Sequence, residues 1–161
     1  MAARRLLKEY KQLVEDAPEG IHAGPTHEDD FLHWECLLDG PEGSLYEGGC
    51  FKAVLDFPKE YPMKPPTMRF VSEIFHPNIG KDGKVCISIL HSGDDPSNYE
   101  QRSERWSAAQ SVEKILLSVM SMLAEPNPDS PANVDASKMM REDMATFKQR
   151  AADNVRKSLG L

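Results

Sequence analysis

The chain has 161 residues, of which 40% are hydrophobic, and a formal net charge of −7 from 19 Lys and Arg against 26 Asp and Glu. This length suits one domain with its own core, so we expect a single domain over residues 1–161. The acidic balance excludes proteins that bind nucleic acid or anionic membranes through bulk positive charge, and no stretch approaches the ~20 apolar residues of a membrane span.

The first segment is predicted to be a helix with one apolar and one basic face. Apolar side chains recur at helical spacing, namely Leu6, Leu7, Tyr10, Leu13 and Val14. The opposite face carries Arg4, Arg5, Lys8 and Lys11, and residues 17–20 end the helix. The segment has neither the long apolar core nor the cleavage site of a secretory signal.

Four short strands are predicted next, over residues 21–23, 32–38, 50–57 and 68–71. Alternating positions of the second and third strands place these side chains on one face: Leu32, Trp34, Cys36, Leu38, Phe51, Ala53, Leu55 and Phe57. Turn residues separate the strands and no helical crossover intervenes. The sheet should therefore be an antiparallel meander in an α+β fold.

Two features of the strand region allow more than one interpretation. Ten Asp and Glu residues and no Lys or Arg lie between Gln12 and Phe51. This run is either a solvated face or an acidic surface for a basic partner segment. Prolines also stiffen the loop over residues 61–66, where Met63 is either a buried plug or an exposed contact point.

Three helices are predicted after residue 106. Ser107 and Gln110 form a capping box at the start of the first of these, which ends before Pro126. Its strong apolar stripe predicts a buried central helix: Val112, Ile115, Leu116, Val119, Met122 and Leu123. Asp135 should cap a third helix that carries Met139, Met140, Met144 and Phe147, and a short last helix should include Ala151 and Val155.

Residues 76–90 suggest chemistry when they are taken together. A His-Pro-Asn sequence at residues 76–78 is followed, after seven residues, by Cys86 in a short apolar strand predicted over residues 85–90. Taken singly, the tripeptide is common in turns and a buried Cys is a small hydrophobe. No second Cys or His has metal-ligand spacing, so no metal site is expected. The three cysteines form no CxxC pattern, which favours a reducing compartment, with Cys36 and Cys50 used for packing.

The combination resembles the ubiquitin-conjugating enzyme family along essentially the whole chain. Besides the basic first helix and the His-Pro-Asn and Cys pattern, the shared features are Tyr-Pro-x-x-Pro-Pro at 61–66, Trp-Ser at 106–107 and Glu-Pro-Asn-Pro at 125–128. The chain is most similar to the branch with an acidic loop, here about residues 91–105, that acts in endoplasmic-reticulum-associated degradation. The resemblance implies an N-terminal helix, a four-stranded meander, a central helix and two C-terminal helices.

The resemblance implies that Cys86 accepts ubiquitin from the activating enzyme as a thioester and passes it to lysine amines of targets or of ubiquitin. A thiolate suits this role because it is a good leaving group. No bound cofactor is implied, since the activating enzyme uses the ATP. In this pattern Asn78 either stabilises the oxyanion or holds its loop, while His76 and Pro77 are scaffold.

One departure from the family concerns the proton acceptor. Ser130 stands where many members have an aspartate that orients or deprotonates the lysine. Serine is a poor base at neutral pH, so Asp129, Asp94 or Asp95 is expected to substitute for that aspartate. The acidic loop could equally be a surface loop without a catalytic part. His91 is a further candidate, with a partly buried spacer as the alternative.

The resemblance also implies docking surfaces for a RING-type ligase and the activating enzyme. By position these comprise Arg5, Lys8, Met63, Ser107 and Ala108, although many relatives have an aromatic residue at Met63 and a proline at Ala108. The basic helix face could instead be merely solvated. In the acidic-loop branch, the back of the sheet binds a helical segment of a membrane-anchored ligase or adaptor. The expected location is thus cytoplasmic, with recruitment to the endoplasmic reticulum by a partner.

The sequence also bears on three other functions. A non-catalytic binding module of the same fold is disfavoured, because Cys86 is present in register. Conjugation of a different ubiquitin-like modifier is not distinguished by the sequence. A cysteine hydrolase would need a paired His and a deep pocket, and nothing in the sequence requires them.

Overall fold

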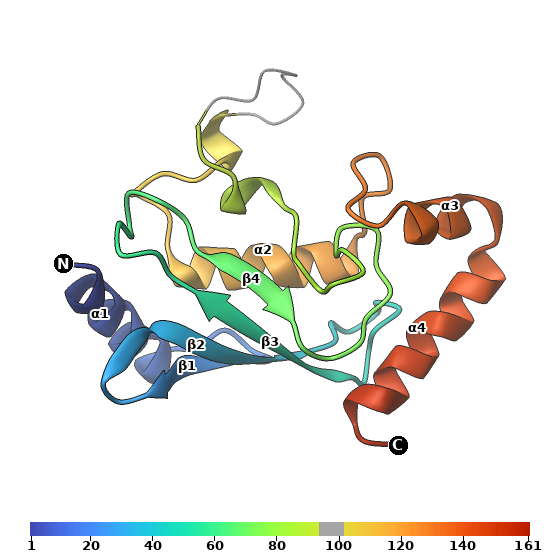
Figure 1. Cartoon of the computed structure of the whole chain (residues 1–161). Helices are drawn as coiled ribbons and strands as arrows, with labels where there is room; N and C mark the ends of the chain where they lie inside the picture. The colour runs from blue at the N-terminus through green and yellow to red at the C-terminus, as the bar shows by residue number, and fades with distance from the viewer. Residues whose placement is uncertain (94–101) are drawn as a thin grey trace.

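The computed structural model describes residues 1–93 and 102–161, so Asp94 and Asp95 lie outside the described residues. Figure 1 shows the elements, which in chain order are α1 (Ala2–Glu15), β1 (Ile21–His27), β2 (Asp30–Asp39), β3 (Cys50–Asp56), β4 (Thr67–Phe70), the 3₁₀ helices η1 (Ser88–Leu90) and η2 (Arg102–Glu104), α2 (Val112–Ala124), α3 (Val134–Glu142) and α4 (Met144–Ser158). The predicted α+β architecture is confirmed.

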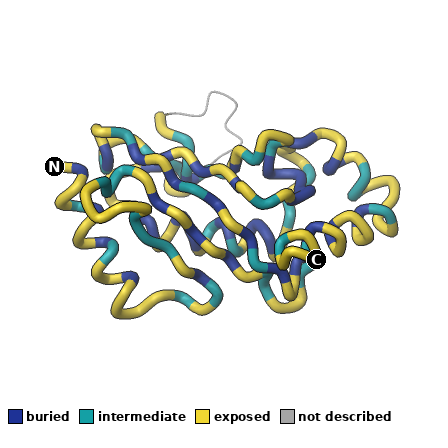
Figure 2. The backbone as a smooth tube through the Cα atoms, turned by 60° about the horizontal axis from the view of Figure 1, so that its bottom comes forward, coloured by how far each residue is buried: buried dark blue, intermediate teal, exposed yellow. Residues whose placement is uncertain are grey.

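The strands form an antiparallel meander in the order β1-β2-β3-β4, as predicted. The register sets Leu38 opposite Phe51, and it sets Leu55 between Trp34 on one side and Met68 on the other. All five side chains are buried, and Figure 2 shows buried and exposed positions alternating along the strands. Each large apolar side chain that leaves water in this way contributes about 1.5–3 kcal/mol.

Helices α1 and α2 cover the buried face of the sheet. Leu6 and Leu13 of α1 join Ile115, Leu116 and Val119 of α2 in the same hydrophobic core as the inward side chains of the strands. A second, smaller core lies between α3 and α4, where Phe75, Ala136 and Phe147 are buried together. The molecule is elongated, because α3 and α4 extend from the end of the sheet opposite α1 (Figure 1).

Helix α2 begins later than the capping box predicts. Its N-cap is Ser111, whose hydroxyl accepts a hydrogen bond from the Lys114 N–H at 3.2 Å. The hydroxyl of Ser107 instead accepts from the Ala109 N–H at 3.3 Å in a turn. A tertiary contact causes this shift of the helix start. The buried Glu9 carboxylate accepts a hydrogen bond from the Val112 N–H at 2.8 Å and thereby fixes the first turn of α2.

The C-terminal helices also divide differently from the prediction. Asn133, not Asp135, caps α3, since its side chain accepts from the Ala136 N–H at 3.1 Å. Asp143 then starts a new helix, so Phe147 belongs to α4, which runs on to Ser158 and is not short. Methionines of α3 pack on the same small core as Phe147, which explains why the two apolar patterns looked continuous.

The apolar strand predicted over residues 85–90 is absent from the described structure. Val85 makes an isolated bridge to Ile79, and η1 follows at once. Among the described residues, no helix is both long and apolar enough to cross a membrane.

Candidate active site

Cys86 lies on the surface, on the short segment between the Val85 bridge and η1. Its thiol is exposed beside a hollow of about 340 Å³ whose lining includes Pro66, Thr67, Lys84, Leu90, His91 and Ala132. The Cys86 N–H donates to the Asn78 carbonyl at 3.0 Å, and the Val85 N–H donates to the Met68 carbonyl at 2.9 Å. These backbone bonds attach the cysteine segment to the His-Pro-Asn segment and to β4.

A glycine turn precedes this segment. Gly83 has a φ of +91°, and a Cβ there would lie 2.3 Å from the Phe70 carbonyl oxygen. The Phe70 N–H donates to the Gly83 carbonyl at 2.8 Å, so the turn is pressed against the end of β4. Glycine is required here because a side chain would meet backbone, and the turn delivers Cys86 to its position.

The structure brings His91 to Cys86. The Cys86 Sγ and the His91 Nε2 are 3.5 Å apart, within hydrogen-bond distance for sulfur. η1 creates this approach, and the His91 main chain is fixed on both sides, by its N–H to Ser88 at 2.9 Å and by the Trp106 N–H to its carbonyl at 2.8 Å. A neutral imidazole so placed can accept a proton from a thiol.

His76 is wholly buried and holds the loop before Cys86 against α2. Its Nε2 lies 2.8 Å from the Met122 carbonyl, and its Nδ1 accepts the Asn78 N–H at 2.9 Å. Burial lowers the pKa of His76 to about 4, and the bond to Met122 offsets part of that effect. At neutral pH this imidazole is therefore uncharged, with its proton on Nε2.

The Asn78 side chain forms hydrogen bonds with residues 127–130, which we call the post-α2 segment. Its Nδ2 donates to the Asn127 carbonyl at 2.9 Å and to the Ser130 carbonyl at 3.3 Å. Its Oδ1 accepts the Asn127 N–H at 2.9 Å. Pro77 adds a backbone attachment, because its carbonyl accepts the N–H groups of Ala132 and Asn133 at 2.7 and 3.0 Å.

The candidate replacements for the missing aspartate differ in availability. Asp129 is exposed, but its carboxylate is 2.8 Å from Nη2 of Arg141 on α3. Ser130 is exposed too, and its carbonyl is the group that bonds to Asn78. The His91 imidazole, by contrast, lies in direct contact with the Cys86 thiol.

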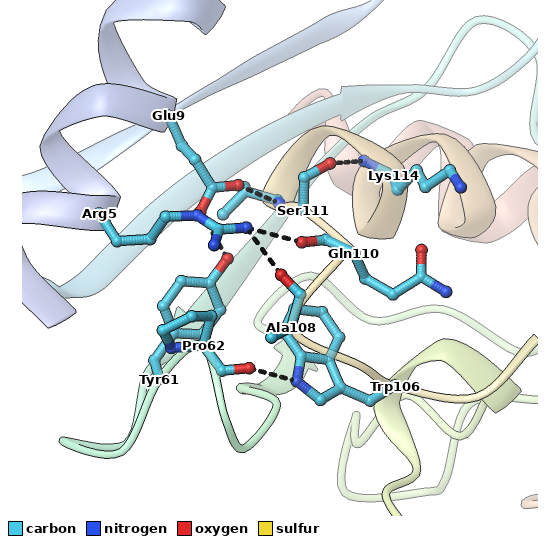
Figure 3. A network of polar contacts seen from close by, with 10 residues as sticks. Arg5, Glu9, Tyr61, Pro62, Trp106, Ala108, Gln110, Ser111 and Lys114 are labelled. Atoms are coloured by element: carbon cyan, nitrogen blue, oxygen red, sulfur yellow. Dashed lines mark hydrogen bonds and ion pairs between the residues drawn. The ribbon is translucent and has the colours of Figure 1, made fainter.

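Arg5 of α1 belongs to an internal network (Figure 3). Its guanidinium donates to the carbonyls of Gln110 and Ala108 at 2.9 and 3.3 Å and to the Glu9 carboxylate at 3.2 Å. Glu9 also accepts the Tyr61 hydroxyl at 2.6 Å. Arg5 is thus occupied in joining α1 to two loops, which the sequence did not reveal.

The other predicted docking residues are accessible. The Met63 side chain is 74% exposed, so the buried-plug interpretation is wrong. Lys8, Ser107 and Ala108 are exposed as well. The two loops that carry Met63 and Ala108 are held together, since the Trp106 indole N–H donates to the Pro62 carbonyl at 2.8 Å. Their docking role stays a prediction.

The acidic run does not map as a whole onto the outer face of the sheet. Glu35 and Asp39 are exposed on β2, and Glu35 pairs with Lys52 of β3 at 3.4 Å. The remaining eight carboxylates lie at the end of α1, around the β1–β2 turn and in the loop before β3. Leu37 is 44% exposed on the same strand, so this face is mixed and not uniformly acidic.

The two remaining cysteines differ from Cys86. Cys36 is buried in the core, and burial raises its pKa to about 12. Cys50 is half-buried at the start of β3, and partial burial and the nearby Asp39 raise its pKa. Over residues 1–93 and 102–161, no group of His, Cys, Asp and Glu could hold a metal ion.

Comparison with known proteins gives concordant matches. The family model described as ubiquitin-conjugating enzyme matches residues 5–155. A Schizosaccharomyces pombe protein, ubiquitin-conjugating enzyme E2-18 kDa, is 61% identical over 162 residues, covering 100% of this chain and 98% of its own. Human ubiquitin-conjugating enzyme E2 G2 is 61% identical over 161 residues, with 99% and 98% covered. Arabidopsis thaliana ubiquitin-conjugating enzyme E2 13 is 50% identical over 154 residues, with 95% and 93% covered.

Proposed function

Because the chain belongs to the ubiquitin-conjugating enzyme family, whose members transfer ubiquitin through a thioester intermediate, we propose that Cys86 is the residue that forms the thioester. The exposed thiol beside an open hollow, with the His91 Nε2 at 3.5 Å, is the observation that carries this assignment. Cys36 cannot serve, because it is buried in the core.

The chemistry proceeds in two acyl transfers. The Cys86 thiolate attacks the thioester carbonyl of ubiquitin on the activating enzyme, whose thiolate leaves. A lysine amine then attacks the Cys86 thioester, an isopeptide bond forms, and the Cys86 thiolate leaves. We assign His91 as the group that takes the thiol proton in the first transfer, releases it to the departing thiolate or to solvent, and takes the amine proton in the second.

Asn78 acts in this proposal by organising the post-α2 segment, while its own carbonyl accepts the Cys86 N–H. Both hydrogens of its amide nitrogen are used, one on Asn127 and one on Ser130. The longer bond, at 3.3 Å to the Ser130 carbonyl, is the one that a developing oxyanion would replace. The loop-holding role and the oxyanion role are thus successive uses of one amide.

We also propose the partners that the family pattern implies. A RING-type ligase and the activating enzyme would dock where Lys8, Met63 and Ala108 are exposed, a surface that the Arg5 network holds in place. A basic helical segment of a membrane-anchored adaptor would bind the outer sheet face around Glu35 and Leu37 and bring a cytoplasmic enzyme to the endoplasmic reticulum for degradation of misfolded proteins. No bound cofactor is required, since the activating enzyme uses the ATP.

A non-reducing gel tests the central assignment. The protein is incubated with activating enzyme, ATP and ubiquitin, and a thiol-sensitive shift of one ubiquitin mass is expected. Cys86→Ala should abolish the shift, whereas Cys50→Ala, the matched control, should retain it. An unshifted wild type would refute the assignment for ubiquitin, and parallel reactions with other ubiquitin-like modifiers would show whether one of them is carried instead.

A further inference from the structure

Helix α3 also holds the post-α2 segment, through residues that Asn78 does not contact. The Pro128 carbonyl accepts the Ser137 hydroxyl at 2.6 Å and the Arg141 Nη2 at 3.0 Å. The same Nη2 lies 2.8 Å from the Asp129 carboxylate. Ser137 and Arg141, one helical turn apart on α3, therefore hydrogen-bond to two consecutive residues of the segment.

The post-α2 segment connects these α3 contacts to Cys86. Asn127 and Ser130, which flank the two residues held by α3, are the residues that bond to the Asn78 side chain. The Asn78 carbonyl in turn accepts the Cys86 N–H at 3.0 Å. A displacement of Pro128 would thus pass to the Asn78 amide and to the backbone of the cysteine through direct hydrogen bonds.

We propose that Arg141 and Ser137 are positioning residues for the transfer of ubiquitin from Cys86 to lysine, an inference that rests on the function proposed above. They set where the Asn127 and Ser130 carbonyls meet the Asn78 amide, and a donor fixed before the reaction needs no reorganisation during it. Arg141 also pairs with the Asp129 carboxylate at 2.8 Å, so the same side chain fixes two consecutive residues of the segment.

The two residues suit different tests because their burial differs. Ser137 is buried, so its removal also affects packing. The Arg141 side chain is 55% exposed, and its substitution leaves the core intact. Lys138 is an exposed cation on the same helix, and Lys138→Ala is the matched control for loss of one positive charge.

The experiment separates charging from discharge. Each variant is loaded with ubiquitin by the activating enzyme, ATP is removed, free lysine is added, and the loss of the thioester is followed on a non-reducing gel. Arg141→Ala should discharge about five- to tenfold more slowly, because the segment loses one of its anchors, and it should load as the wild type does. Arg141→Lys should recover part of the rate, and Lys138→Ala should match the wild type.

Several outcomes would overturn the inference. Discharge of Arg141→Ala at the wild-type rate would do so. The inference would also fail if Arg141→Ala slowed loading as much as discharge and lowered the melting temperature as well. That pattern would mark a general role in folding. Ser137→Ala gives an independent check, because a variant that loads normally should again discharge slowly. Failure of the wild type to load would instead refute the Cys86 assignment, so the two hypotheses fail separately.

Discussion

The contact between Cys86 and His91 joins the proposed nucleophile to its proposed base, five residues apart in the chain. The imidazole is half-buried and its main chain is fixed at both the N–H and the carbonyl, so the ring is presented to the sulfur by a rigid support. A base with restricted motion is effective because proton transfer needs a short, aligned contact. The base proposed here therefore needs no change of its own backbone bonds between the two acyl transfers.

His91→Gln tests this contact at the residue scale. Glutamine keeps hydrogen-bonding atoms but cannot take a proton at neutral pH, so loading and lysine discharge should both slow by about 10- to 100-fold at pH 7. The defect should shrink at pH 9, where thiolate and free amine form without a base. His27→Gln, at the exposed end of β1, should leave both rates unchanged. A defect equal at both pH values would contradict the proposed proton transfer.

Parts of the site were predictable because they are local in sequence. Cys86, His91 and Asn78 lie within fourteen residues, and the resemblance of this stretch to the family pattern made them candidates without knowledge of the fold. Ser137 and Arg141 gave no such signal, since a serine and an arginine on an amphipathic helix look like ordinary surface residues. Their role depends on the docking of α3 against the post-α2 segment, which local periodicity does not encode.

At the scale of elements, Glu9 links α1, the Tyr61 loop and the first turn of α2. One carboxylate oxygen accepts hydrogen bonds from the Tyr61 hydroxyl and the Arg5 guanidinium, and the other accepts one from the Val112 N–H (Figure 3). Helix N-termini favour negative charge, so the buried carboxylate stabilises the start of α2 as well as the ion pair. Three elements distant in sequence thus share one acceptor.

We expect Glu9→Gln to lower the free energy of unfolding by about 1–3 kcal/mol, because an amide leaves Arg5 without its counter-charge and cannot accept all three donors. Urea denaturation followed by circular dichroism measures this change. Glu15→Gln, at the exposed end of α1, should stay within about 0.5 kcal/mol of the wild type. Stability of Glu9→Gln equal to that of Glu15→Gln would show that the network adds nothing to folding.

The same network explains why element boundaries were harder to predict than the elements themselves. The alternation of β2 and β3 and the stripe of α2 depend on burial, which hydrophobic periodicity reports directly. The start of α2 depends on Glu9, more than 100 residues earlier, which selected Ser111 over an equally suitable Ser107. Helix boundaries that depend on such distant contacts cannot be inferred from a short stretch of sequence.

At the scale of the whole molecule, acid should weaken the fold through His76. Its pKa is about 4 in the native state because of burial and about 6.5 when the chain is unfolded. The unfolded chain therefore binds this proton between those pH values and the native chain does not. We expect the free energy of unfolding to fall as pH falls, by about 2 kcal/mol from this group at pH 5.

Urea denaturation at pH 7 and pH 5 measures this loss, and His33 supplies an internal check. The exposed His33 has a raised pKa because of its hydrogen bond to Asp56 and the nearby Asp30. Its contribution has the opposite sign, since it is present below pH 6.5 and lost as pH rises through the folded value. His33→Gln should therefore enlarge the loss between pH 7 and pH 5. Equal stability of the wild type at the two pH values would contradict the role assigned to His76.

The unequal environments of the three cysteines have a practical consequence. Cys36 is sealed in the core with a pKa of about 12, and the raised pKa of Cys50 keeps its half-buried sulfur protonated near neutrality. An alkylating reagent therefore meets one accessible thiol beside an imidazole and two poorly reactive ones. We therefore expect a fluorescent or spin label to react first at Cys86 without prior removal of the other two cysteines, and peptide mass spectrometry of the labelled chain would check this.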